Sequence, residues 1–90
     1  MNKARMDSIL KSIAEEIDKA ELTRLEFDLF ETIMYALGKV DPTTIDNWLR
    51  VCLARGLLRE LAKPDPRASR VFVRGQRFNE HLTWQPSTVP

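Results

Sequence analysis

The chain of 90 residues has little cysteine, histidine or glycine, and it lacks any long hydrophobic run. A single cysteine cannot form an internal disulfide, which makes a reducing cytoplasm the expected setting. One cysteine and one histidine also make a structural zinc site within one chain improbable. No apolar stretch approaches the ~20 residues of a membrane-spanning helix, and no apolar secretory region is present at the N-terminus. These absences favour a small cytoplasmic protein with one hydrophobic core.

Motifs of catalysis are missing as well. The sequence contains no glycine-rich phosphate loop after a strand, no G-x-S-x-G and no H-E-x-x-H. The paired carboxylates Glu15 and Glu16 are expected on the solvent face of a helix, where no desolvated pocket would tune them for acid–base catalysis. We therefore predict that the chain is not an enzyme and that it requires no cofactor.

Positive charge is concentrated in one segment, although the net charge is only +1. Residues 55–77 carry seven lysines and arginines against two acidic residues, whereas residues 1–40 carry six against eight. A local excess of this kind is typical of a surface that binds a polyanion. The alternative is a strand pair whose arginines simply lie on its solvated face.

The spacing of apolar residues predicts two helices in the first half of the chain. Residues 3–20 carry an apolar stripe that also permits a dimer seam, although packing within the chain is the favoured interpretation of so short a repeat. The sequence Thr23-Arg24-Leu25-Glu26 fits an S/T-x-x-E capping box, so a second helix is expected from Thr23 to about Leu37, closed by Gly38.

The third predicted helix, residues 42–55, has the clearest boundaries. Asp41 suits the N-cap, Pro42 suits the first helical position, and Gly56 supplies a left-handed residue after the end. Val40 is expected to pack on Ile45 as a hydrophobic staple. The buried stripe is expected to contain Ile45, Trp48, Leu49, Cys52 and Leu53, with Thr43, Asn47, Arg50 and Ala54 on the opposite face.

After Gly56 the pattern changes to that of a β-hairpin. The segment 57–61 is short and apolar, and residues 70–74 are β-branched and aromatic. Between them, Pro64-Asp65-Pro66 is a strong turn signal in a basic loop. Residues 78–84 are expected to cover part of the core, and residues 85–90 to form a loose tail, which leaves residues 1–84 as a single domain.

This order of elements resembles the winged-helix superfamily over about residues 4–75. The segment T-T-I-D-N-W-L-R-V-C-L-A-R-G-L-L-R-E-L is similar to a recognition helix followed by the first wing strand. The resemblance implies a mainly α fold, a winged helix-turn-helix of three helices and a two-stranded wing. It also implies binding of double-stranded DNA, with the third helix in the major groove and the wing near the backbone.

The residue types support that implication independently. Asn47 can pair with adenine and Arg50 with guanine, and hydroxyl groups at a helix N-terminus suit phosphates. Basic residues on the wing suit the DNA backbone. The candidate DNA-binding residues are Thr43, Thr44, Asn47, Arg50, Arg55, Lys63, Arg67 and Arg70.

Two functions stay open at this point. The favoured one is a small DNA-binding transcriptional regulator or architectural factor, with a possible homodimer formed through the first helix or the segment Phe78 to Trp84. The alternative is a winged-helix subunit that docks on protein in a nucleic-acid-processing complex, because a fold alone does not decide function. Asp46 argues mildly for the alternative, because a carboxylate repels phosphates.

Overall fold

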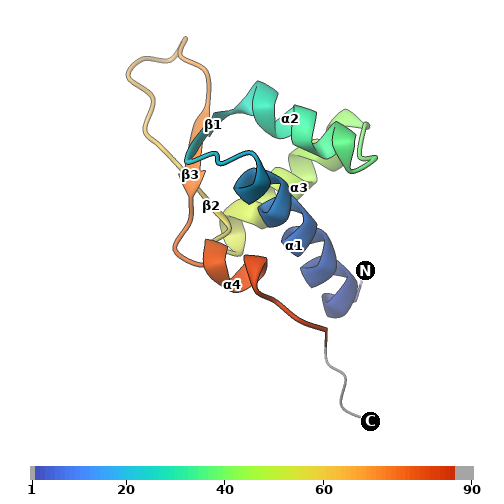
Figure 1. Ribbon diagram of the computed structural model, residues 1–90. Helices are drawn as coiled ribbons and strands as arrows, with labels where there is room; N and C mark the ends of the chain where they lie inside the picture. Colours follow the sequence, from blue (N-terminus) through green and yellow to red (C-terminus); the bar gives the residue numbers. More distant parts are fainter. Residues whose placement is uncertain (1, 87–90) are drawn as a thin grey trace.

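A computed structural model describes residues 2–86, which form four helices and a small three-stranded antiparallel sheet (Figure 1). The mainly helical architecture with a small sheet agrees with the prediction. The sheet has a third strand, residues 24–26, that was not expected. A fourth short helix follows the last strand. The elements are α1 Lys3–Lys19, β1 Arg24–Glu26, α2 Phe27–Ala36, α3 Pro42–Ala54, β2 Leu58–Glu60, β3 Val71–Arg74 and α4 Phe78–Leu82.

The extra strand β1 occupies the residues that were predicted to begin the second helix. Leu25 is buried between exposed Arg24 and Glu26, which is the alternation of a strand with one buried face. The backbone N–H of Phe27 donates to the carbonyl of Arg70 at 3.1 Å, and Arg70 directly precedes β3. This hydrogen bond extends the pairing of β1 with β3. The capping box was therefore wrong: α2 begins at Phe27, and no side chain caps it.

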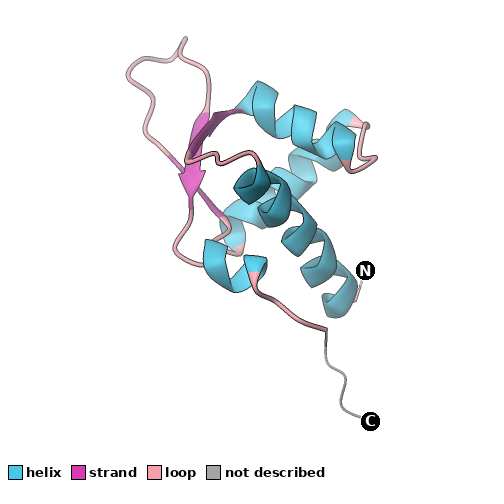
Figure 2. Cartoon of the chain, viewed as in Figure 1, coloured by secondary structure: helices cyan, strands magenta, loops and turns pink. Residues whose placement is uncertain are grey.

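Strand β3 lies in the centre of the sheet, between β1 and β2 (Figure 2). Leu25 of β1 faces Phe72 of β3, and Glu60 of β2 faces Phe72 from the other side. The pairing of β1 with β3 joins residues that are about half the chain apart in sequence. Local patterns could not reveal it, because the stabilising partner of β1 lies on a distant segment.

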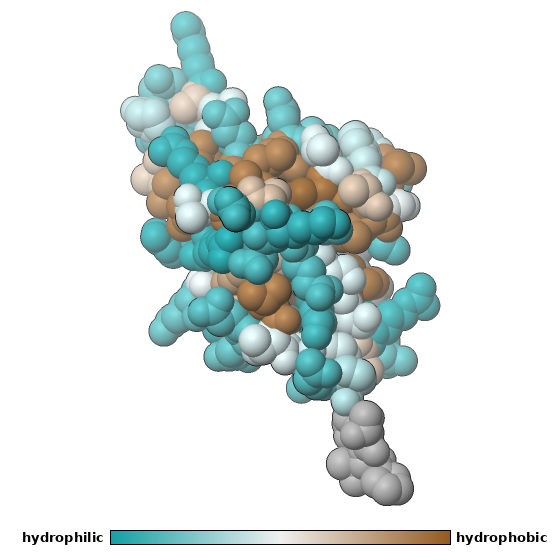
Figure 3. Space-filling view, viewed as in Figure 1, coloured by the Kyte–Doolittle hydropathy of each residue, from teal (hydrophilic) through white to brown (hydrophobic). Residues whose placement is uncertain are grey.

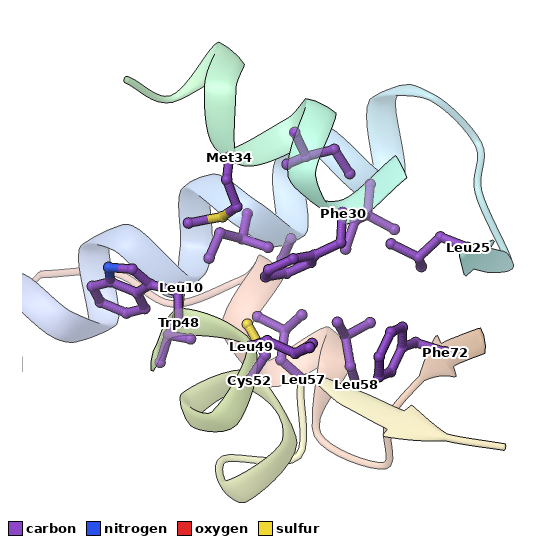
Figure 4. Packing of buried hydrophobic residues seen from close by; sticks show 14 of the residues in the cluster. Leu10, Leu25, Phe30, Met34, Trp48, Leu49, Cys52, Leu57, Leu58 and Phe72 are labelled. Carbon is purple, nitrogen blue, oxygen red and sulfur yellow. The ribbon is translucent and has the colours of Figure 1, made fainter. Parts of the chain in front are cut away.

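All seven elements contribute to one hydrophobic core. Phe30 of α2 and Phe72 of β3 are the largest of its completely buried side chains (Figure 4). The apolar stripe of α1 also faces inward. Helix α4, which carries buried Phe78, packs against α1. The buried residues of α3 are Ile45, Trp48, Leu49 and Cys52, in agreement with the predicted stripe apart from half-buried Leu53.

The turn before α3 is open, and the loop between β2 and β3 projects from the body. Val40 is 66% exposed, so the expected staple onto Ile45 does not form. Residues 61–70 extend beyond the sheet as a long irregular loop (Figure 1). Most of the predicted tail, residues 87–90, lies outside the described residues. Within residues 2–86, no helix has both the length and the apolar character that crossing a bilayer requires.

Candidate nucleic-acid interface

Helix α3 presents three exposed polar side chains along one face. The helix begins as predicted, because a carboxylate oxygen of Asp41 accepts a hydrogen bond from the Thr44 backbone N–H at 3.0 Å. The buried stripe holds the opposite side of the helix against the core. Thr43, Asn47 and Arg50 are left facing solvent at successive turns. This face can donate and accept hydrogen bonds without any rearrangement of the helix.

Two side chains of this region have partners within the chain. The Thr44 hydroxyl donates to the Asp41 carboxylate at 3.3 Å, so it reinforces the cap and is half-buried. Arg50 lies 3.4 Å from Asp46 one turn earlier, with side chains 76% and 47% exposed. An exposed pair of this kind contributes little to stability. Arg50 can therefore leave Asp46 for an external ligand at small cost.

A hollow of about 510 Å³ separates the exposed face of α3 from α2. Its walls include acidic Glu31 from α2 and acidic Asp46 from α3, next to the cationic Arg50. Half-buried Phe27 supplies an apolar part of the wall. The surface is therefore mixed in charge, which a strictly basic DNA-binding groove would not be.

The projecting loop carries the exposed basic residues Lys63 and Arg67. The backbone N–H of Arg67 donates to the Asp65 carboxylate at 2.7 Å, which shapes the turn from Asp65 to Ala68. No ion pair involves either basic side chain in the part of the chain that the structure describes. Both positive charges are therefore available to an external anion.

Arg70, at the base of the loop, is half-buried and paired within the chain. Its guanidinium donates two hydrogen bonds of 2.8 Å to the Glu60 carboxylate and lies over the Phe72 ring, 5.3 Å from the centroid. The hydrogen bonds from Arg70 lower the pKa of the Glu60 carboxyl, and they raise the pKa of Arg70. This bidentate pair secures the base of the loop to β2 rather than presenting a free cation.

Arg55 lies away from the exposed face of α3, in a polar cluster between α1 and α4. Its guanidinium donates to the Asp7 carboxylate at 2.9 Å, and its backbone carbonyl accepts a hydrogen bond from His81 Nε2 at 2.8 Å. Asp7 and His81 are both buried. The three residues connect the end of α3 to α1 and α4, so Arg55 has a structural role in the folded chain.

Sequence reasoning missed this cluster because its members are far apart along the chain. Asp7 lies directly after a residue of the apolar stripe of α1, and an acidic residue beside such a stripe is the one available signal. His81 had no partner motif at all. Only the packing of α4 on α1 brings these side chains to the end of α3.

The positive segment 55–77 is less basic in three dimensions than in sequence. Four of its seven cations form ion pairs, and two of those pairs use acidic residues of α1. Within residues 2–86, its cations without an ion pair are Arg59, Lys63 and Arg67. The unpaired positive charges therefore lie on the exposed face of the sheet, at Arg59, and on the projecting loop, at Lys63 and Arg67.

The remaining reactive side chain is a core residue. Cys52 is completely buried, and its burial raises the pKa of the thiol to about 12. It behaves as a small hydrophobic side chain, as its place on the α3 stripe predicted. In residues 2–86, no three His, Cys, Asp or Glu side chains gather into a group that could hold a metal ion.

Thr43, Asn47 and Arg50 thus share one exposed face, and Lys63 and Arg67 share one projecting loop, whereas Thr44, Arg55 and Arg70 are engaged in contacts within the chain. No family model, curated protein or solved structure matches the chain. A proposal for its function therefore rests on the geometry of these residues.

Proposed function

We propose that the chain is a winged-helix domain that binds duplex DNA in the cytoplasm, as a transcriptional regulator or an architectural factor. The observation that carries the proposal is the exposed face of α3, where Thr43, Asn47 and Arg50 point outward from a well-capped helix. The order helix, strand, helix, helix and two strands supports it, since β1 occupies the place between the first and third helices where many winged-helix domains have an extra element.

On this proposal, α3 enters the major groove with the exposed face that carries Thr43, Asn47 and Arg50. Asn47 is suited to adenine and Arg50 to guanine, because each can form two hydrogen bonds with the base edge. The Thr43 hydroxyl, at the N-terminus of the helix, is suited to a phosphate. Asp46 faces the same ligand, and its pairing with Arg50 holds the arginine until DNA replaces the carboxylate.

The loop 61–70 acts as the wing. Lys63 and Arg67 are exposed and contact the DNA backbone, where they add affinity without selecting a sequence. Arg70 does not touch DNA in this proposal, because its guanidinium is occupied by Glu60 and holds the wing in place. Arg55 likewise stabilises the end of α3.

Fluorescence anisotropy with mixed-sequence duplex DNA at several salt concentrations tests the proposal. Affinity should fall steeply with salt, because phosphate contacts release counterions. R67A should weaken binding to all sequences and reduce the salt slope by about one, whereas R50A should alter sequence preference. The control is R77A, because Arg77 is an exposed arginine of the α4 region that pairs with Glu80. The absence of binding at low salt would overturn the proposal.

The alternative function is docking on a protein partner, and the mixed charge around α3 favours it. Glu31 and Asp46 line the same hollow as Arg50, and Tyr35 and Val40 expose apolar surface near the turn before α3. The substitutions E31Q and D46N separate the two functions. If DNA is the ligand, removal of either carboxylate should strengthen binding. If protein is the ligand, neither the parent nor these variants should bind duplex DNA at low salt.

A further inference from the structure

Strand β1 lies at an edge of the sheet, and its outer side is unpaired. It pairs only with β3. Because the Phe27 N–H donates toward β3, antiparallel alternation directs the backbone N–H and C=O groups of Arg24 and Glu26 away from β3. A row of unpaired groups of this kind can accept another strand.

The side chains of β1 have an order that complements itself. Arg24 and Glu26 are exposed on the outer face of the sheet, and buried Leu25 lies between them. In an antiparallel pair of two copies with Leu25 at the two-fold axis, Arg24 of each copy lies directly opposite Glu26 of the other. Opposite charges at directly facing positions stabilise a strand pair.

The other edge of the sheet, strand β2, lacks a self-complementary order of charges. Strand β2 has exposed Arg59 at its centre, so the equivalent two-fold pairing would place two arginines opposite each other. Its Glu60 is already held by Arg70. Self-association through the sheet is therefore favoured at β1 and disfavoured at β2.

The surface beside β1 has room for a second strand. An open hollow of about 520 Å³ lies between this edge and the first turns of α2. Half-buried Leu29 contributes apolar surface to it, and the space-filling view shows apolar surface gathered over α2 (Figure 3). A second copy of β1 would lie in this hollow. Its lining residues are Arg24, Leu25, Glu26, Asp28, Leu29 and Thr32.

The dimer surfaces expected from the sequence are largely used within the chain. Leu10, Ile13 and Ile17 of the α1 stripe are completely buried in the core. Phe78 of the C-terminal segment is also buried. A dimer formed through either set would have to expose residues that hold the domain together, whereas pairing at β1 requires no unpacking.

We propose that two copies of the chain associate by antiparallel pairing of their β1 edges, with Leu25 at the two-fold axis, to form one continuous six-stranded sheet. The contact is small, so the dimer is a weak one with a dissociation constant in the micromolar range or above. This inference does not depend on DNA binding, and its test contains no DNA. A two-fold dimer would also present two copies of α3 in related orientations.

Sedimentation equilibrium of the full chain from micromolar to millimolar concentration tests the pairing. R24E and E26R should each weaken dimerisation about tenfold, because each replaces two attractive cross-strand pairs with repulsive ones. An equimolar mixture of R24E and E26R should form a heterodimer at about the parental strength, and so should the double variant R24E/E26R with itself. The control R59E changes an outer-face arginine on β2 and should leave association unchanged.

Amide hydrogen exchange of the parent chain supplies a measurement that needs no substitution. At high concentration the N–H groups of Arg24 and Glu26 should exchange more slowly, while that of Leu25, which already faces β3, should not change. A parent that stays monomeric at millimolar concentration overturns the proposal. A dimer that is insensitive to R24E and E26R, or that their mixture fails to restore, overturns it as well.

Discussion

The two ends of α3 are built in opposite ways. Before the helix, Gly38 has a φ of +79°, and a Cβ added there would meet nothing within 4 Å. After the helix, Gly56 and Gly75 lie so close that a Cβ on Gly75 would overlap the Gly56 carbonyl oxygen. The C-terminal end is therefore enclosed by other elements, whereas the N-terminal end is open to solvent.

A second contrast separates Arg50, in the body of α3, from Arg55 at its C-cap. Arg50 has a side chain that is 76% exposed, and its one partner is a neighbour on the same helix. Arg55 is 31% exposed and pairs with Asp7 across the fold. The difference shows that the position of the partner, on the same helix or across the fold, decides whether an arginine is loosely paired at the surface or held within the structure.

Substitution of the two glycines should give the largest difference between the ends. G75A is expected to destabilise the protein by about 3 kcal/mol, because the new methyl group overlaps backbone that cannot move away. G38A should cost only about 1 kcal/mol, the strain of a left-handed conformation in open space. Chemical denaturation followed by circular dichroism measures both values. Equal costs would show that the two ends are equally constrained.

Removal of the carboxylate partners should give the next largest effect. D7A is expected to cost about 2 kcal/mol, because it leaves the Arg55 guanidinium without its buried partner. The matched variant D46A removes the exposed partner of Arg50 and should change stability by less than about 0.5 kcal/mol. The same denaturation experiment tests the pair, and a cost for D46A as large as that for D7A would contradict the contrast.

The open end of α3 still depends on its cap. D41A should cost about 1 kcal/mol, because the Thr44 N–H loses its hydrogen-bond acceptor at the first turn. D41N retains a side-chain oxygen and should recover most of that stability. Thermal unfolding of the two variants beside the parent gives the comparison. If both variants unfold with the parent, the cap contributes nothing to the stability of this end.

The smallest expected effect is at the base of the loop 61–70, where Arg70 resembles Arg55 in pairing with a carboxylate from another element of the chain. Since Arg70 lowers the pKa of Glu60 in the folded chain, the stabilisation by this pair is present at neutral pH. The stabilisation is lost as the pH falls from about 4.5, the ordinary pKa of a glutamate in the unfolded chain, through the lower pKa of Glu60 in the folded chain. E60Q should remove this part of the acid sensitivity, worth less than about 1 kcal/mol, whereas the exposed-pair variant E80Q should keep it. Thermal midpoints measured between neutral and acid pH distinguish the variants.

Much of the helical part of the fold was predictable because its signals are local. The boundaries of α3 agree with the prediction to within one residue, since Asp41, Pro42 and Gly56 act on neighbouring backbone. The predicted first helix also agrees at both ends to within a residue. The outward placement of Thr43, Asn47 and Arg50 follows directly from helical periodicity.

Strand β1 and the engaged arginines could not be predicted in the same way. The capping box at Thr23 is a sound local signal, yet pairing with β3 stabilises residues 24–26 in an extended conformation instead. The partners of Arg55 and Arg70 lie 48 and 10 residues away in sequence. No spacing rule on a helix or within a short turn connects such residues.

The sequence by itself determined where α3 begins and ends and which of its side chains point outward, because capping and periodicity depend only on nearby residues. Tertiary structure alone decided which cations remain available to a ligand and which edge of the sheet stays unpaired. Both depend on the approach of segments distant in the chain, here β1 to β3 and α1 to the end of α3. The helix that the sequence marks most clearly thus has one end enclosed by the fold and one end open to solvent.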